Sequence, residues 1–343
     1  MKSTPVEIGL LDPLPDDGFQ IKDPSVVRMA DGTFLMYATV FTRKEHYRIG
    51  RFEAKHPRGP WHELSRIRHD IAGSEVCAPS MRLRERDDER LWTMYVQTAC
   101  FQENGRIEKA VSSDGVHFLC ALAAVMSVAD VPAFPESALA GLYDVSVSDI
   151  RWKGVDYECM VFSGYRRVGC GDLYLSMRVK ADAETKWQKP RLLLRQEDVP
   201  FHNRPDSPNF EWGLEGAKLI QVSDDFFAVV GVCFLDKGPE HRGSRQRVFM
   251  AGGSSPMHPF RLMTLPIEPI PAQGENGHPD TIDMGNSIGL LYQERDGDGK
   301  PWYLRYREYS KAAFRLLMQP LPVPANDPLP LLRPAATPMP ATV

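Results

Sequence analysis

The feature that most constrains this chain is a repeat of short apolar runs between Lys22 and about Leu317. The runs are rich in Val, Ile, Phe, Tyr and Met and are separated by Gly, Pro, Asp and Ser, which is typical of an all-β chain. Five units align, each with three apolar runs followed by a turn and an aromatic residue that begins a fourth. These aromatic residues are Trp61, Phe118, Trp187, Phe260 and Phe314. The repeat predicts an all-β fold, a five-bladed β-propeller with four-stranded antiparallel blades.

The units divide the chain into three parts. They span residues 23–64, 77–118, 143–194, 214–263 and 278–317. We therefore expect an N-terminal extension (1–20), a propeller catalytic domain (21–318) and a C-terminal tail (319–343) that is too rich in Pro to continue a ladder or a helix. The fifth unit predicts its outermost strand at 312–317, and residues 1–20 offer a further strand to close the ring. A β-sandwich is the alternative fold with many short strands.

Charge and composition exclude several kinds of partner. The 343 residues carry 41 basic and 45 acidic side chains, a net charge of −4, so no bulk positive field would attract nucleic acid or acidic lipid. The sequence shows neither a signal peptide nor a run of about 18 apolar residues, which predicts a cytoplasmic protein that does not cross a membrane. The six Cys form no CxxC pair and mostly have apolar neighbours, as expected of reduced core thiols.

The first strand of each predicted blade carries the candidate site. In a propeller this strand lines the central channel, so its opening residues can converge on a ligand. The openings are Asp23, the 75–79 stretch, Asp144, Glu215 and His278. Three carboxylates around one cavity cannot all ionise without cost, so at least one pKa should rise and provide a proton donor at neutral pH. That combination suits glycoside chemistry.

These openings resemble the glycoside hydrolases of family 43, five-bladed propellers grouped with the family 32 fructosidases. The resemblance covers nearly all of residues 22–317 and rests on short motifs in order: Lys22-Asp23-Pro24-Ser25, Ala78-Pro79-Ser80, Tyr143-Asp144-Val145-Ser146, Leu214-Glu215-Gly216-Ala217, Gly277-His278 and the turn Gly59-Pro60-Trp61. It implies an inverting mechanism with Asp23 as general base, Glu215 as general acid and Asp144 tuning the pKa of the acid. The resembled channel histidine, His278, would orient substrate or contact an ion, so a channel Ca²⁺ is possible.

The sequence also departs from the family's pattern. Cys77 stands where the family often has Trp, and no Pro follows Asp144. The sugar-binding subsites are therefore expected to be unusual. The motifs that mark family 32 fructosidases are poorly matched, so a fructosidase is disfavoured.

Further residues near the openings are candidate substrate contacts. They are Glu75, Tyr143, Arg166, Trp212 and Arg295: two aromatic rings for stacking on a sugar, an acid for a hydroxyl, and rim arginines for a sugar acid or phosphate. Asp149 is the alternative to Asp144, and Glu211 the alternative to Glu215. The HExxH, P-loop, GxGxxG and GxSxG patterns are absent, and no histidine cluster has metal-ligand spacing. We expect no required cofactor and no metal site defined by sequence.

The function that the sequence predicts is hydrolysis of a small glycoside or oligosaccharide, with arabinofuranosides or xylosides favoured by the family resemblance. The partner is then a carbohydrate substrate. Two alternatives stay open. One is a propeller that binds carbohydrate without cleaving it, because a fold does not fix a function. The other is a phosphorylase or transferase on the same scaffold, which would require phosphate or an acceptor.

Overall fold

The described part of the chain holds almost all of the predicted repeat. A computed structural model of the protein describes residues 6–7, 19–42, 47–72, 76–86, 89–98, 105–121, 123–132, 139–166, 171–180, 186–204, 207, 212–237, 243–267 and 273–318. The side chains of residues 6, 7, 86 and 166 are not described. Two candidate residues, Glu75 and Glu211, lie outside the described residues.

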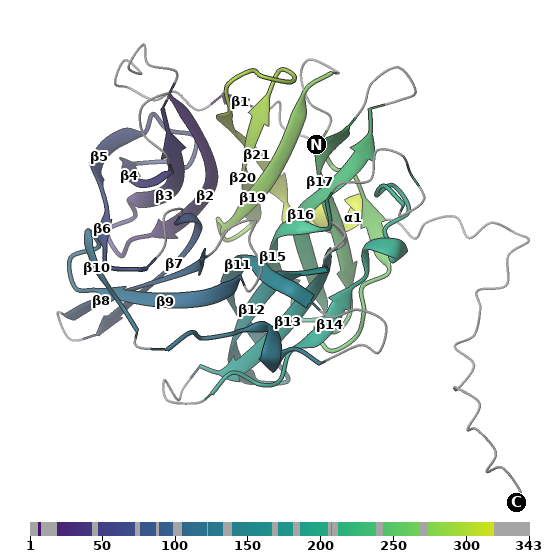
Figure 1. Cartoon of the computed structure of the whole chain (residues 1–343), viewed down its shortest axis with the longest axis horizontal. Helices are drawn as coiled ribbons and strands as arrows, with labels where there is room; N and C mark the ends of the chain where they lie inside the picture. The colour runs from purple at the N-terminus through teal and green to yellow at the C-terminus, as the bar shows by residue number, and fades with distance from the viewer. Residues whose placement is uncertain are drawn as a thin grey trace, which may run out of the picture.

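Five sheets stand in a ring, and each is formed mainly by antiparallel strands that follow one another in the chain (Figure 1). Blade one consists of β2 (Gln20–Arg28), β3 (Phe34–Phe41), β4 (Arg48–Ala54) and β5 (His62–Arg66). Blade two consists of β7 (Cys77–Arg86), β8 (Glu89–Thr98), β9 (Arg106–Ser112) and β10 (His117–Cys120), and β6 (Arg68–His69) adds to its outer edge parallel to β10. Blade three consists of β11 (Leu139–Trp152), β12 (Val155–Arg166), β13 (Gly171–Val179) and β14 (Arg191–Leu194).

Two further blades complete the ring. Short 3-10 turns lie between blades two and three, at Val128–Asp130, and between blades three and four, at Gln196–Asp198. Blade four consists of β15 (Glu215–Ser223), β16 (Phe226–Asp236), β17 (Ser244–Gly253) and β18 (Leu262–Thr264). Blade five consists of β19 (Glu275–Asp283), β20 (Ser287–Arg295), β21 (Tyr303–Ser310) and β1 (Val6–Glu7). The predicted five-bladed propeller is confirmed, and the sandwich alternative is wrong.

The outermost strand of blade five comes from the opposite end of the chain from the one predicted. β1 pairs antiparallel with β21, so the N-terminal extension does close the ring. Residues 312–317 are not a strand, because Lys311–Leu317 forms the helix α1. The Ser310 side chain caps this helix by accepting a hydrogen bond from Ala313 N at 3.1 Å, and Ala, Leu, Lys and Arg favour the helical backbone.

The repeated aromatic residues belong to the core. Trp61, Phe118, Phe260 and Phe314 are buried, and Trp187 packs against the core from a partly buried position. The apolar clusters lie between neighbouring blades. Leu173 and Leu175 of blade three, for example, pack with Phe227 and Val229 of blade four. Burial of both faces of every sheet explains why the strands read as continuous apolar runs.

Two other predictions concern cysteines and membrane spans. Cys77, Cys159 and Cys233 are buried free thiols and Cys120 is a half-buried one, as predicted for core cysteines, while Cys100 and Cys170 lie outside the described residues. Within the described ranges, no helix has the length and apolar character needed to span a bilayer.

Candidate active site

Every blade breaks its regular pairing at the same point of its innermost strand. The register between the first and second strands shifts at 22/25, 77/80, 143/146, 215/218 and 277/280. One residue at each break has a left-handed backbone: Asp23, Ala78, Asp144, Gly216 and His278, with φ between 40° and 51°. Four of these residues are not glycine, and that conformation is costly for them. A bulge redirects a side chain, so these five breaks aim one ring of residues at the channel.

The residue two positions after each left-handed residue ties its blade to the next. These residues are Ser25, Ser80, Ser146, Lys218 and Asp280. Ser25 Oγ and Ser80 Oγ accept hydrogen bonds from the backbone of the following blade at 3.0 and 2.8 Å, and Ser146 Oγ donates to the following blade at 2.5 Å. Lys218 pairs with Asp280, whose other oxygen accepts from the backbone of blade one at 2.6 Å. This closed circle of contacts fixes the relative positions of the bulges above it.

The structure brings together Asp23, Asp144, Glu215 and His278. His278 lies between two carboxylates, with Nδ1 3.3 Å from Asp23 Oδ1 and Nε2 3.6 Å from Glu215 Oε2. Asp144, Glu215 and His278 each offer one atom that could bind a metal ion, and these three atoms all lie within 4.8 Å of one another. The three acids predicted from the strand openings therefore converge on one histidine.

Glu215 does not occupy the same position in its blade as Asp23 and Asp144 do, contrary to the sequence expectation. It stands one residue earlier in the register, and Gly216 takes the left-handed position. A Cβ on Gly216 would lie 2.7 Å from Nδ1 of His278, so only glycine leaves room for the imidazole there. The sequence pair Glu-Gly thus lets the imidazole approach the backbone, with Glu215 Oε2 3.6 Å from its Nε2.

Electrostatics makes His278 a cation at neutral pH. Burial alone would lower the pKa of the ring, but the charges of Asp23 and Asp144 and the contact with Glu215 outweigh burial and raise it to about 9. A protonated imidazole has N–H donors on both sides, which matches its position between two carboxyl groups. His278 therefore balances part of the negative charge of the site.

The surroundings of Glu215 favour its acid form. Burial raises its pKa, contact with His278 opposes that rise, and the charge of Asp144 adds to it, so that the pKa is about 7. Burial also raises the pKa of Asp144, whose acidity is further reduced by the charge of Asp23. Tyr165 donates its hydroxyl to Glu215 Oε1, which orients the carboxyl group. A carboxyl group with a pKa near neutrality is the usual proton donor of a glycosidase.

Asp23 is buried beside Lys22 and His278. Lys22 Nζ lies 3.8 Å from Asp23 Oδ2, and the Gln293 side chain accepts the Asp23 backbone N–H at 3.1 Å. Among the described residues, no group completes a hydrogen bond to Asp23 Oδ1, although the atom is buried. The nitrogen that faces this oxygen is His278 Nδ1, at 3.3 Å.

The imidazole of His278 separates Asp23 from Glu215 and limits the distance between them. Its ring nitrogens are about 2 Å apart, so the facing oxygens of Asp23 and Glu215 are at most about 9 Å apart, a limit that includes the carboxyl separations of both inverting (roughly 6.5–9.5 Å) and retaining (about 5–5.5 Å) glycosidases. A cavity of about 40 Å³ lies among the bulges, lined by Asp23, Asp144 and His278, which is enough for a water molecule or two.

The candidate sugar-stacking rings occupy different environments. Tyr143 is buried and packs edge-on against Tyr165, with ring centroids 4.9 Å apart, so it supports the tyrosine that contacts Glu215. Trp212 keeps 37% of its surface exposed and lies three residues before the acid, tilted over Phe234. The stacking role stays a prediction for both residues, and exposure favours Trp212.

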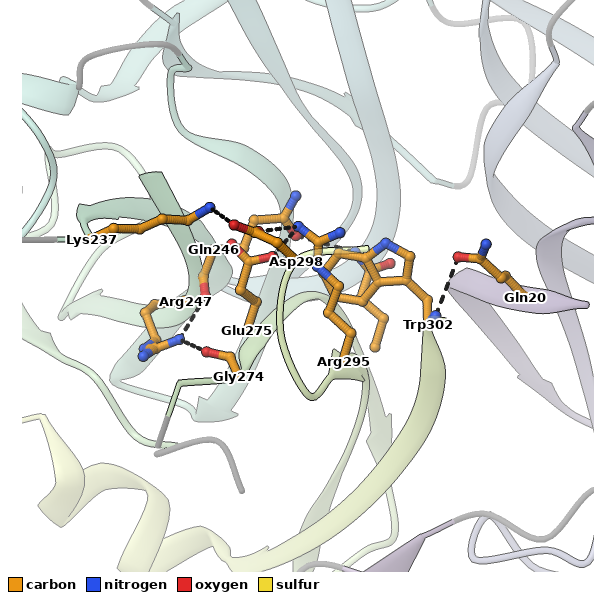
Figure 2. Close-up of polar contacts among 10 residues, drawn as sticks. Gln20, Lys237, Gln246, Arg247, Gly274, Glu275, Arg295, Asp298 and Trp302 are labelled. Atoms are coloured by element: carbon orange, nitrogen blue, oxygen red, sulfur yellow. Dashed lines mark hydrogen bonds and ion pairs between the residues drawn. The ribbon is translucent and has the colours of Figure 1, made fainter. Parts of the chain in front are cut away.

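Arg295 is engaged in a network at the edge of blade five (Figure 2). Its guanidinium pairs with the buried Glu275, lies 3.5 Å from Asp298 and stacks 4.6 Å above the ring of Trp302. Lys237 completes the network through Asp298. The charge of Arg295 is thus already balanced, which weakens the prediction that it holds an anionic substrate.

The other candidates lie elsewhere or outside the described residues. Asp149, the alternative channel acid, pairs with Arg82 and Lys180 and does not join the four converging residues. Arg166 ends β12, and its side chain is not described.

Sequence reasoning missed several groups that complete the site. Lys22, Gln97 and Tyr165 contact Asp23, the Asp144 backbone and Glu215, respectively. Lys22 adjoins a predicted acid and could have been found from that position. Gln97 and Tyr165 lie in second strands, where no sequence pattern distinguishes them from ordinary strand residues.

The channel Ca²⁺ that the family resemblance raised fits these residues poorly. Calcium prefers oxygen ligands, whereas one of the three groups that would bind it, beside Asp144 and Glu215, is the imidazole of His278, which its neighbours keep protonated. His278 and Lys22 already supply positive charge to the acids.

Comparison with known proteins supports the fold. No protein-family model matches the sequence, and no curated protein matches it. Solved structures do match: an endo-arabinase from Bacteroides thetaiotaomicron at 12% identity with a TM-score of 0.59, covering 88% of this chain and 97% of that one. A thermostable family-43 glycoside hydrolase matches at 14% identity and TM-score 0.56, covering 89% and 91% of the two chains. An α-L-arabinofuranosidase from Podospora anserina in complex with cellotriose matches at 15% identity and TM-score 0.56, covering 90% and 96%.

These matches extend over nearly the whole of both chains in each pair, although sequence identity is low. The resemblance found in the strand openings is therefore confirmed at the level of fold: this chain is a five-bladed β-propeller of the kind that these glycoside hydrolases adopt.

Proposed function

We propose that this protein is a glycoside hydrolase acting by inversion, with Asp23 as general base and Glu215 as general acid. The observation that carries the proposal is the pairing of a carboxyl group whose pKa is raised to about 7 with a second carboxylate across one histidine. An inverting site requires one protonated and one ionised carboxyl group on opposite faces of the sugar. Here the surroundings of Glu215 favour its protonated form.

The residues would divide the work as follows. Glu215 donates its proton to the leaving oxygen, and Tyr165 holds the carboxyl group in place for that transfer. Asp23 takes a proton from a water molecule as that water attacks the anomeric carbon from the other face. Asp144 keeps the pKa of Glu215 high through its negative charge, and the His278 cation fixes the spacing between acid and base.

The proposed substrates are small glycosides of pentoses, arabinofuranosides before xylosides. The support is the fold shared with an endo-arabinase and an α-L-arabinofuranosidase.

Hydrolysis assays on a panel of aryl and oligomeric α-arabinofuranosides, β-xylosides, β-galactosides and β-fructosides, run with and without phosphate, test the proposal. Asp23→Asn and Glu215→Gln should each lower turnover by about 10²–10⁴-fold, the usual contribution of a general acid or base. Glu89→Gln, at an exposed site on β8, is the matched control and should keep full activity. Full activity in both site variants would refute the assignment. Turnover that requires phosphate would identify a phosphorylase, and glycan binding without turnover a binding propeller.

A further inference from the structure

One position on the second strand recurs in every blade, beside the bulge. The residue at this position pairs with the residue just before the left-handed one of its own blade, where the register between the two strands breaks. From blade one to blade five these residues are Thr39, Gln97, Ser163, Val232 and Gln293. Three of them accept a hydrogen bond from the backbone N–H of the left-handed residue in the following blade. Second strands therefore support the bulges at three of the five junctions between blades.

Two of these acceptors are glutamines that hold the backbone of a candidate catalytic acid. Gln293 Oε1 accepts the backbone N–H of Asp23 at 3.1 Å, and Gln97 Oε1 accepts the backbone N–H of Asp144. Both glutamines and both acids are buried. A bulge leaves the N–H of its extra residue without a partner in its own sheet, and a buried N–H without a partner is costly. Each glutamine therefore stabilises the left-handed backbone that aims its acid.

Thr39 makes the same contact at a bulge without an acid. Its Oγ1 accepts the backbone N–H of Ala78 at 2.9 Å. Ala78 has the left-handed conformation of the two acids but carries only a methyl group. At the remaining two positions, Val232 has no polar side-chain atom, and the hydroxyl group of Ser163 has no hydrogen-bond partner among the residues that the structure describes. Glutamine thus occupies this position in the two blades that precede a left-handed acid, and in no other blade.

The amide group of each glutamine is itself fixed. Gln293 Nε2 donates to Gln246 Oε1 at 3.2 Å, and Gln97 Nε2 donates to Cys77 Sγ at 3.4 Å. Gly277 leaves room for the first contact, since a Cβ there would lie 2.6 Å from Gln246 Oε1. An amide that donates through its nitrogen on one side presents its oxygen on the other, toward the backbone N–H of the acid.

We infer that Gln293 and Gln97 are positioning residues of the candidate active site, Gln293 for Asp23 and Gln97 for Asp144. Each acts through the backbone of its acid. The reacting groups of an enzyme must be placed closely, and a displacement of about 1 Å can lower the rate about 100-fold. The effect on catalysis rests on the proposed function, whereas the support of the two backbones does not.

Replacing each glutamine by methionine removes the acceptor at similar side-chain volume, and Thr39→Val removes the matching acceptor where no acid follows. Gln293→Met and Gln97→Met should each lower kcat at least about tenfold and change KM less than about threefold, because a displaced acid affects the transition state more than substrate binding. Thr39→Val should keep the kcat of the parent. The urea midpoints of all three variants should fall by similar amounts, because each variant leaves one backbone N–H without its acceptor.

Combination with an acid variant shows whether Gln293 acts through Asp23. Once Asp23→Asn has removed the base, adding Gln293→Met should lower kcat little further, because the two residues form one unit. Because two blades carry the same arrangement, either methionine variant tests the inference if the other does not fold.

The protonation of His278 provides a readout that does not require turnover. Against the effect of burial, the charge of Asp23 helps to hold the pKa of this ring at about 9, from an oxygen 3.3 Å from Nδ1. Displacement of Asp23 in Gln293→Met should therefore lower the pKa of His278, whereas Thr39→Val should leave it unchanged. NMR titration of the histidine rings measures both, with His278→Asn to assign the signal.

The two readouts separate this inference from the proposed function. If the parent hydrolyses no glycoside, the proposed function fails and the pKa of His278 alone decides the inference. The inference is wrong if both methionine variants keep the kcat of the parent, if Thr39→Val loses as much kcat as they do, or if Gln293→Met leaves the pKa of His278 as it is in the parent.

Discussion

Replacing Glu215 by Gln should stabilise this protein, and the stabilisation should grow with pH. Burial raises the pKa of this carboxyl group from 4.5 to about 7, so the folded protein retains a proton that the unfolded chain has already released. The contribution of Glu215 to the free energy of unfolding is fully present below pH 4.5 and is lost as the pH rises through 7. A glutamine does not titrate, so the variant escapes that loss.

The size of the effect follows from the shift in pKa. Between pH 5 and pH 8 the parent should lose about 2–3 kcal/mol of unfolding free energy through Glu215, which the variant should keep. Titration of His278 adds little to this difference in unfolding free energy. Its pKa is about 9 in the parent, and Asp23 and Asp144, which also raise it, are present in both proteins. The expected gap is large against a typical total stability of about 5–15 kcal/mol.

Urea unfolding of parent and variant at pH 5, 6, 7 and 8 measures the gap. The difference in unfolding free energy should change in favour of Glu215→Gln by about 2–3 kcal/mol across that range, with unchanged slopes against denaturant. Glu89→Gln, a change at an exposed carboxyl group, should show no such trend. A constant or shrinking gap would mean that the fold does not hold Glu215 in its acid form, and the proposed proton donor would lose its physical basis.

Four further outcomes are expected. Hydrolysis should decline above about pH 7 as Glu215 loses its proton, and a kcat/KM profile that stays flat to pH 9 would contradict the acid role. Tyr165→Phe removes the hydroxyl donor to Glu215 and should lower kcat more than it raises KM, while costing about 1–3 kcal/mol in stability; a change in KM alone would indicate a role in substrate binding. Gly216→Ala should lower activity, because the added methyl group displaces His278 and strains the left-handed backbone; parent-like kinetics would argue against the close approach of His278 to Gly216. Removing residues 1–8 deletes β1 and should lower the unfolding midpoint, and an unchanged midpoint would refute that expectation.

The sequence predicted the architecture because the repeat is a local pattern. Each blade must bury two faces, which requires apolar runs, and each run must end in a turn, so both signals are written in consecutive residues. Trp61 and Phe118 show the same logic, since each follows a turn and fills the space between blades. The error at 312–317 arose because short apolar runs do not distinguish strand from helix. Ser310 as a cap and the pairing of β1 with β21 decided the outcome.

The strand openings named the acids, but their roles depend on the tertiary structure. Asp23, Asp144 and Glu215 were recognisable from their places in the repeat, whereas the position of His278 between two of them results from bulges in different blades. The raised pKa of Glu215 comes from burial and from charges remote in sequence, which no local pattern encodes.

The sequence alone therefore determined the five blades and which residues open them, since periodicity and turn residues act within a few positions along the chain. Only the tertiary structure decided that the pKa of Glu215 rises to about 7 and that Arg295 is neutralised by Glu275. Those properties depend on distances and dielectric surroundings created when separate blades close into one ring.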